Sequence, residues 1–190
     1  MERAIAGAGF ETLNLGYPSR TAPIETLADI ALEKAAAFLP GAREPLHVVG
    51  HSLGGLLARA MIRAAPTLNP GRVVTLGTPH AGSEIADLLV GTWPYRRLFG
   101  PAGAQLTTRP VWRPERVTFC LGAIAGDRAF DPLSWWLIPG PNDGKVSAVR
   151  AGIDGMTDRI TLHAAHTLMP RNRTVIAQTI HFLRNGCFAR

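Results

Sequence analysis

Residues 46–55, with the sequence LHVVGHSLGG, indicate the fold most directly. Leu46 to Val49 predict a short buried strand, and a helical pattern follows from Leu53 to about Ala65. The Gly-x-Ser-x-Gly pattern therefore stands between a strand and a helix, which is the setting of a nucleophilic serine in α/β enzymes. A glycine-rich turn with Ser52 as a helix N-cap is the alternative, and it leaves one of the two flanking glycines unexplained.

The residues around Ser52 suit a sharp turn between strand and helix. We expect the positions two before and two after the serine, Gly50 and Gly54, to be small because the chain folds back on itself there. His51 completes the turn. The backbone N–H of Leu53, at the start of the predicted helix, points toward an oxyanion formed beside Ser52.

A serine hydroxyl needs a base and an orienting acid before it attacks a carbonyl carbon. In this arrangement the acid and then the histidine follow the serine along the chain, on loops after later strands. Asp143, in the turn Asn-Asp-Gly, and His166, shortly after the last predicted strand, meet that order. Both fall where open α/β sheets place their sites, at the carboxyl ends of strands.

Each of these two assignments has a rival. Asp127 lies nearer the end of its predicted strand than Asp143 does, and Asn-Asp-Gly is also a common turn. His163 competes with His166 for the role of base, although it belongs to the predicted strand itself. His80 lies in a loop after an earlier strand, one strand too early for the base of this arrangement.

Apolar runs and helical periodicity alternate along the chain. We predict strands at 10–15, 46–49, 72–76, 117–124 and 159–163, and helices at 24–39, 53–65, 84–90 and 172–184, after a helix that ends at Gly9. This alternation predicts an α/β fold with a mostly parallel sheet of about five strands and helices on both faces. Residues 1–190 read as a single domain. An irregular, aromatic-rich insertion interrupts it at about 91–115.

Composition excludes several other classes of protein. The 190 residues are 46% hydrophobic, which is enough for a buried core, and no apolar run is long enough to span a membrane. The net charge of +6 comes mainly from dispersed arginines without a basic stripe, so we expect no nucleic-acid partner. We also expect no cofactor and no metal, because nucleotide-binding loops and histidine pairs with ligand spacing are absent. No signal peptide is visible, which predicts a cytoplasmic protein.

Several motifs together resemble bacterial α/β-hydrolases of the lipase and esterase kind. These are GHSLGG at 50–55, LGTPHAGS at 76–83, PGPNDGKVS at 139–147 and AAHTLMP at 164–170. The resemblance covers nearly the whole chain and implies a triad of Ser52, His166 and Asp143. It also implies that the motif at 78–83 shapes the floor of the pocket.

The chain departs from the family pattern at its start. These hydrolases carry an earlier strand that ends in a His-Gly loop, and this loop supplies a second oxyanion N–H. The resemblance places that strand between the strands predicted at 10–15 and 46–49, so we expect an N-terminally truncated sheet. Either those two strands pair directly, or the true chain starts upstream of Met1. An unpaired edge there would favour self-association.

The leading hypothesis is a serine hydrolase that cleaves carboxylic esters, including lipid esters. In that case the aromatic residues would line or cover the acyl pocket, although surface anchoring and core packing explain them equally well; they are Trp93, Tyr95, Phe99, Trp112, Trp135 and Trp136. The alternatives are a weakly active or non-catalytic binding protein and an acyltransferase, which would use the same acyl-enzyme.

Overall fold

The computed structural model describes residues 1–38, 45–65, 68–109, 115–130 and 132–190. Its strands are β1 (Leu46–His51), β2 (Pro70–Leu76), β3 (Leu121–Gly126) and β4 (Asp158–Leu162). Its helices are α1 (Glu2–Gly7), α2 (Ile24–Phe38), α3 (Leu53–Ala64), α4 (Glu84–Leu89), α5 (Trp93–Ala104), α6 (Pro132–Leu137), the 3₁₀-helix η1 (His166–Arg171) and α7 (Arg173–Asn185).

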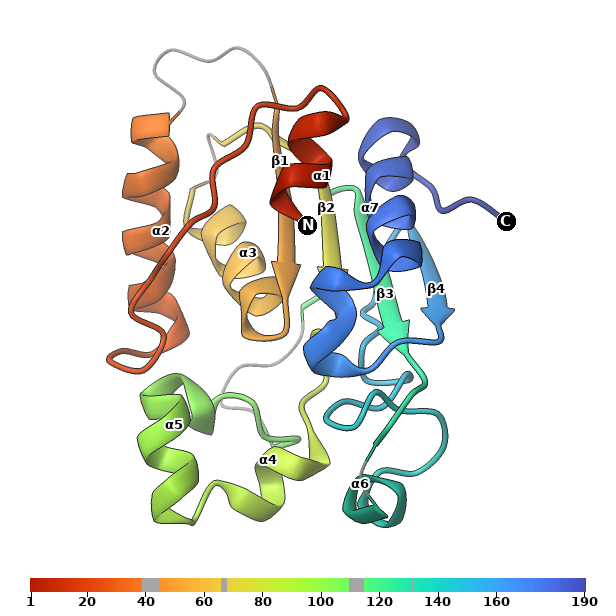
Figure 1. The fold of residues 1–190 in the computed structure, drawn as a ribbon. Helices are drawn as coiled ribbons and strands as arrows, with labels where there is room; N and C mark the ends of the chain where they lie inside the picture. The colour runs from red at the N-terminus through yellow and green to blue at the C-terminus, as the bar shows by residue number, and fades with distance from the viewer. Residues whose placement is uncertain (39–44, 66–67, 110–114, 131) are drawn as a thin grey trace.

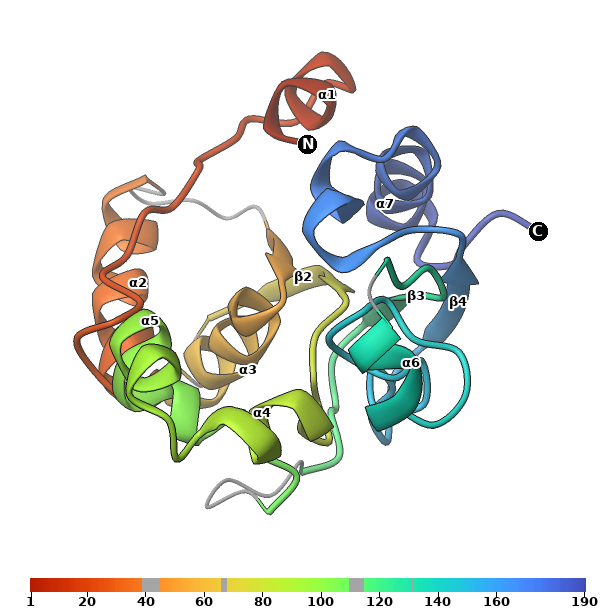
Figure 2. The same cartoon turned by 60° about the horizontal axis from the view of Figure 1, so that its bottom comes forward.

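The four strands form one parallel sheet in the order β1-β2-β3-β4, which confirms the predicted α/β class. Helix α3 packs on one face of the sheet and α7 on the other, while α2 packs against α3 and α1 lies on the same side as α7 (Figures 1 and 2). Alternate residues of β2 show how both faces are buried: Val73 packs with Ala58 of α3, whereas Val74 packs with Phe182 of α7. The carboxyl ends of all four strands therefore meet at one edge of the sheet, which α4, α5 and α6 border (Figure 1).

The strand predicted at 10–15 is wrong. These residues follow an extended path, but the backbone N–H groups of residues 11–16 donate no hydrogen bond to any other described residue. Between this segment and β1 lies a cavity of about 1090 Å³, lined by apolar side chains that include Leu15, Val49 and Leu57. A strand exists only where a neighbouring strand accepts its hydrogen bonds, and here the cavity takes the neighbour's place.

Two other predictions about the elements need correction. Residues 93–104 form the helix α5, which bends at Gly100, so the first half of the predicted irregular insertion is helical. Pro94 sits in the first turn of α5, where the missing N–H has no helical partner to lose, and so it does not prevent the helix. Residues 110–114 of the insertion lie outside the described residues. The strand predicted from Val117 begins only at Leu121.

Candidate active site

Ser52 stands at a strained turn between β1 and α3. Its φ of 53° is the one positive φ among the described residues that are not glycine, and with a ψ of −122° it lies in a sparsely populated region that costs about 1–3 kcal/mol. A hydrogen bond of 2.9 Å from the Ser52 N–H to the Leu76 carbonyl holds the turn against β2. The Thr78 hydroxyl donates to the Ser52 carbonyl at 3.0 Å. Two neighbours thus fix the backbone that presents the Ser52 side chain.

The structure confirms the predicted need for a small residue at one of the two glycines that flank Ser52. A Cβ atom at Gly50 would lie 2.5 Å from the Gly54 carbonyl oxygen, so this position requires glycine. A Cβ atom at Gly54 would meet nothing closer than 3.8 Å, because Gly54 faces the cavity beside β1. The expectation that Gly54 must be small is therefore wrong. The close approach belongs to Gly55, where a Cβ atom would overlap the Thr78 side chain.

The structure brings together the three side chains that the sequence singled out. The Ser52 Oγ lies 3.0 Å from His166 Nε2, and His166 Nδ1 lies 2.8 Å from Asp143 Oδ2. A carboxylate can only accept, so Nδ1–H donates to Asp143 and leaves Nε2 free to accept from the serine hydroxyl. The side chains of His166 and Asp143 are 7% and 1% exposed. Burial keeps competing water away from the hydrogen bond between them.

Backbone groups hold Asp143 in place. The Asp143 Oδ1 accepts hydrogen bonds from the N–H groups of Lys145 and Val146 at 2.9 and 2.8 Å. The His166 N–H donates to the Asp143 carbonyl at 2.9 Å, so the two residues are joined through both backbone and side chain. Gly77 provides room for them: its φ is 53°, and a Cβ atom there would lie 2.7 Å from Asp143 Oδ2.

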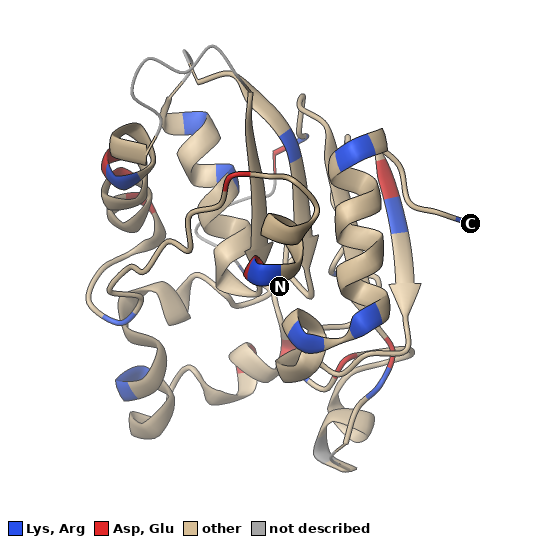
Figure 3. Ribbon diagram, turned by 45° about the horizontal axis from the view of Figure 1, so that its top comes forward, with Lys and Arg blue, Asp and Glu red and all other residues tan. Residues whose placement is uncertain are grey.

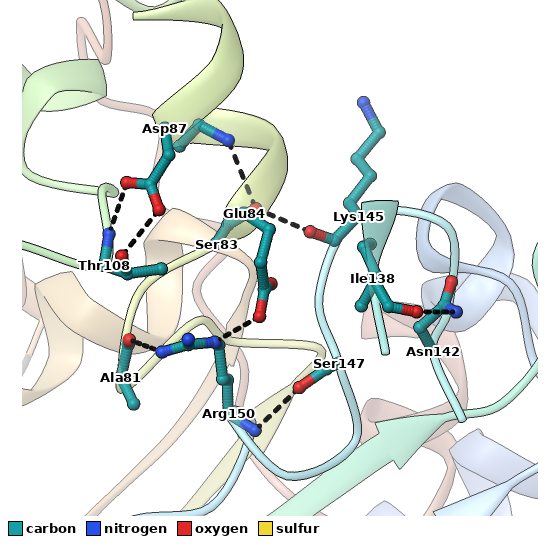
Figure 4. Close-up of polar contacts among 11 residues, drawn as sticks. Ala81, Ser83, Glu84, Asp87, Thr108, Ile138, Asn142, Lys145, Ser147 and Arg150 are labelled. Atoms are coloured by element: carbon teal, nitrogen blue, oxygen red, sulfur yellow. Dashed lines mark hydrogen bonds and ion pairs between the residues drawn. The ribbon is translucent and has the colours of Figure 1, made fainter. Parts of the chain in front are cut away.

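The loop that carries Asp143, residues 141–150 and here called the acid loop, is fastened to the segment before α4 (Figure 4). The Ser83 hydroxyl donates to the Lys145 carbonyl at 2.6 Å. The Arg150 Nε lies 2.5 Å from Glu84 Oε1, and its Nη1 donates to the Ala81 carbonyl at 2.8 Å. Three side chains outside the predicted site therefore fix the loop on which Asp143 depends.

His51 supports His166 from the other side. Its Nε2 lies 2.9 Å from the His166 carbonyl oxygen, which can only accept, so Nε2 carries the proton and donates. Burial and the neighbouring His166 lower the pKa of His51 to about 4. His51 is thus neutral at pH 7, and its ring lies 4.9 Å from that of His166, centroid to centroid.

The rival residues occupy other places. Asp127 and His163 contact each other at 3.0 Å on the surface, away from Ser52. His80 is buried beside Arg59 and Thr75, at 3.4 and 3.2 Å. Burial, with a smaller contribution from the Arg59 charge, lowers the pKa of His80 to about 3.

The Leu53 N–H is the first amide of α3. The first four N–H groups of a helix have no partner one turn back, and the Leu53 N–H donates to no other described residue. It is therefore available to an oxyanion next to Ser52. The described residues hold no cluster of three or more histidine, cysteine or acidic side chains that could bind a metal ion.

The aromatic residues predicted to line a pocket divide into two groups. Tyr95 is buried and Phe99 packs against it in the core between α2, α3 and α5. Trp93, Trp135 and Trp136 are exposed. Trp112 lies outside the described residues. Core packing thus explains the first group, and the second group needs another explanation.

A family model described as the alpha/beta hydrolase family matches residues 4–178. The chain belongs to this family. The resemblance stated from the motifs is confirmed.

Two curated relatives of this alpha/beta hydrolase family member are triacylglycerol lipases, from Pseudarthrobacter phenanthrenivorans and Burkholderia plantarii. Each is 48% identical over 44 residues, which is 23% of this chain. The match spans 14% of the first lipase and 12% of the second. The likeness is therefore strong but local.

Solved structures extend the likeness over most of the chain. The mature form of the Bacillus licheniformis lipase BlEst2 matches with a TM-score of 0.59 and 22% identity, covering 82% of this chain and 76% of that one. The metagenomic carboxyl esterase MGS0156 also matches with a TM-score of 0.59, at 19% identity, covering 83% and 55%. At this level of identity the likeness concerns the fold.

Proposed function

We propose that this member of the alpha/beta hydrolase family is a serine hydrolase that cleaves carboxylic esters. The observation that supports the proposal is the continuous contact from Ser52 through His166 to Asp143, at 3.0 and 2.8 Å. These distances lie within the hydrogen-bond reach that a nucleophile and its base require. The curated lipases that share part of the sequence agree with this reaction class.

In the proposed reaction His166 accepts the proton of the Ser52 hydroxyl through Nε2 as Oγ attacks the ester carbonyl carbon. Asp143 stabilises the resulting imidazolium through its contact with Nδ1. The Leu53 N–H donates to the oxyanion of the tetrahedral intermediate. His166 then returns the proton to the leaving alcohol, and an acyl-enzyme on Ser52 remains. Water attacks this acyl group with His166 again acting as base, which releases the acid and restores Ser52.

The Leu53 N–H is the one oxyanion donor that we assign, and the number of such donors affects the rate of the reaction. Loss of one donor from a pair typically lowers kcat by about 10²–10³-fold. A protein with a single oxyanion donor would be weakly active, which is the alternative that the sequence motifs also left open. An acyltransferase would use the same acyl-enzyme and differ only in the attacking hydroxyl compound. Hydrolysis and acyl transfer are therefore separated by the product formed when an alcohol is added.

Hydrolysis of p-nitrophenyl esters of increasing acyl length tests the proposal. We expect turnover by the wild-type chain and none by Ser52→Ala. Ser19→Ala, which changes a partly exposed serine in the turn before α2, is the matched control and should turn over like wild type. Equal rates for wild type and Ser52→Ala would refute an ester hydrolase at this site. A second assay with added alcohol, in which ester product replaces free acid, would identify an acyltransferase.

A further inference from the structure

Six large apolar side chains are exposed on α4, on α5 and in or just before α6, and we call them the apolar rim. Their exposed fractions run from 50% to 83%. They are Leu88, Trp93, Leu98, Phe130, Trp135 and Trp136. Folded proteins leave single apolar residues exposed without consequence, but a concentration of tryptophan and phenylalanine beside one site indicates a binding surface.

The rim borders the end of the sheet that holds Ser52. Helices α4, α5 and α6 lie together beyond the carboxyl ends of the strands, as Figure 2 shows from that side. Helix α4 contacts both α5 and α6. A flat partner that covers the rim would thus come to lie over the end of the sheet at which Ser52, Asp143 and His166 meet.

Positive charge accompanies the aromatic residues of the rim. The guanidinium of Arg97 lies 5.5 Å from the ring centroid of Trp93, and that of Arg128 lies 4.7 Å from the ring centroid of Phe130. Neither arginine forms an ion pair with a described carboxylate. Figure 3 shows basic residues on α5 as part of this edge.

The nearby carboxylates, in contrast, have partners. Glu84 pairs with Arg150, and Asp127 pairs with His163. Asp87 accepts hydrogen bonds from the Thr108 N–H and hydroxyl at 2.8 and 2.6 Å. Among the described residues, these carboxylates are therefore held by partners within the chain, whereas the guanidinium groups of Arg97 and Arg128 form no ion pair.

We propose that the apolar rim docks this protein on the surface of an anionic phospholipid bilayer. Tryptophan suits the boundary of a bilayer because its ring is apolar and its N–H reaches water or a headgroup. Arginine binds phosphate, and basic residues near anionic lipids each strengthen the attachment. No helix in the described part of the chain could span a membrane, so the attachment we propose lies in the interface. This inference goes beyond the proposed ester hydrolysis and does not depend on it.

Flotation with lipid vesicles tests the proposal without any measurement of activity. The probes are vesicles of phosphatidylcholine alone and of phosphatidylcholine mixed with phosphatidylglycerol. We expect the wild-type chain to bind the mixed vesicles more strongly, and the difference to shrink as salt is added. Trp135→Ser with Trp136→Ser should weaken binding by about tenfold or more. Arg97→Gln with Arg128→Gln should remove the preference for the anionic vesicles.

Matched control variants lie away from the rim. Leu13→Ser changes an exposed apolar residue of the segment before α2, and Arg3→Gln changes an exposed arginine on α1. Both should bind like wild type, and circular dichroism should show every variant folded. Absence of wild-type binding, or equal loss in rim and control variants, would overturn the proposal. So would a dimer that the tryptophan variants dissociate, because the rim would then join two copies of the chain.

Discussion

Ser52 stands between two regions whose polar groups are satisfied to different degrees. On the side of His166 and Asp143, the acid loop, η1 and the start of α4 with the segment before it hold one another through hydrogen bonds and ion pairs of 2.5–2.9 Å. On the side of β1, residues 11–16 make no backbone ladder, and a cavity of about 1090 Å³ separates them from β1. The groups assigned to proton transfer are therefore held from several directions. Among the described residues, those at 11–16 beside β1 have no comparable set of backbone hydrogen bonds.

This difference separates what the two regions contribute to the proposed reaction. Proton transfer depends on the position of His166, which Asp143 and His51 fix from two sides. Stabilisation of the oxyanion depends on the turn at Ser52 and Leu53, which Leu76 and Thr78 hold on one side and the cavity beside β1 borders on the other. We infer that the first part of the mechanism is preorganised to a greater degree than the second.

The largest effect is expected on the supported side. Asp143→Asn should lower kcat by about 10⁴-fold, since an amide cannot hold His166 in the required tautomer or stabilise its charge. The measurement is steady-state hydrolysis of a p-nitrophenyl ester. Asp127→Asn is the matched control, because Asp127 contacts His163 on the surface. Equal losses in the two variants would contradict the assignment of Asp143.

Amide hydrogen exchange compares the two sides directly. Residues 11–16 should exchange about 10³-fold or more faster than the buried amides of β2 and β3, because no hydrogen bond must open first. The outer-edge amides of β1 should also exchange faster than those of β3. Mass spectrometry of peptic fragments measures both. Comparable protection of residues 11–16 and β3 would mean that a partner already pairs with this edge.

Acid should destabilise the fold through its buried histidines. The folded-state pKa is about 4 for His51 and about 3 for His80, below the 6.5 of an unfolded chain. Between each folded-state pKa and 6.5, the unfolded state binds more protons than the folded state. The stability that the two neutral histidines contribute is therefore fully present above pH 6.5 and declines as the pH falls toward 3. For His51 the full loss amounts to about 3 kcal/mol.

Denaturant unfolding at pH 7 and pH 4.5 measures this loss. His51→Gln retains a donor for the His166 carbonyl and should show a smaller decline in stability than wild type. His163→Gln, on the surface, should decline as wild type does. If His51→Gln and wild type lose the same stability over this range, the buried, neutral state assigned to His51 is wrong.

A smaller effect is expected from the fastening of the acid loop. Arg150→Gln removes the ion pair with Glu84 and should lower the free energy of unfolding by about 1–2 kcal/mol. We expect kcat to fall with little change in KM, because Asp143 shifts and substrate contacts remain. Arg190→Gln breaks the pair between the exposed Arg190 side chain and Asp158 and should stay within about 0.5 kcal/mol of wild type. If both variants lost similar stability and activity, Arg150 would have no special role in holding the acid loop.

The sequence predicted the residues of the candidate site better than the contacts that hold them in place. A glycine-flanked serine between strand and helix, followed by an acid and a histidine in order, is a local pattern, and the structure brings Ser52, Asp143 and His166 together. Ser83 and Arg150 gave no such signal, because their role arises from contacts between segments 62 and 69 residues apart. Gly77 could have been found, since glycine directly after a buried strand often marks a close approach.

The errors about the fold have the same origin. Residues 10–15 carry a strand-like pattern, but a strand also needs a paired neighbour, and that lies outside the local sequence. The helix α5 contains Pro94, Gly100 and Pro101, which read as irregular structure. Packing of Tyr95 and Ala102 against the core compensates for these residues. Local preference was thus overruled by tertiary contacts in both regions.

Labelling with a fluorophosphonate probe tests the central claim most directly, because the probe reacts with a serine only when a neighbouring base activates it. Mass spectrometry of the labelled protein locates the adduct. The account predicts one adduct on Ser52 that is absent from Ser52→Ala, forms more slowly in Asp143→Asn and is unchanged in Asp127→Asn. A folded wild-type chain that takes no label at Ser52, or that labels equally well in Asp143→Asn, would contradict it.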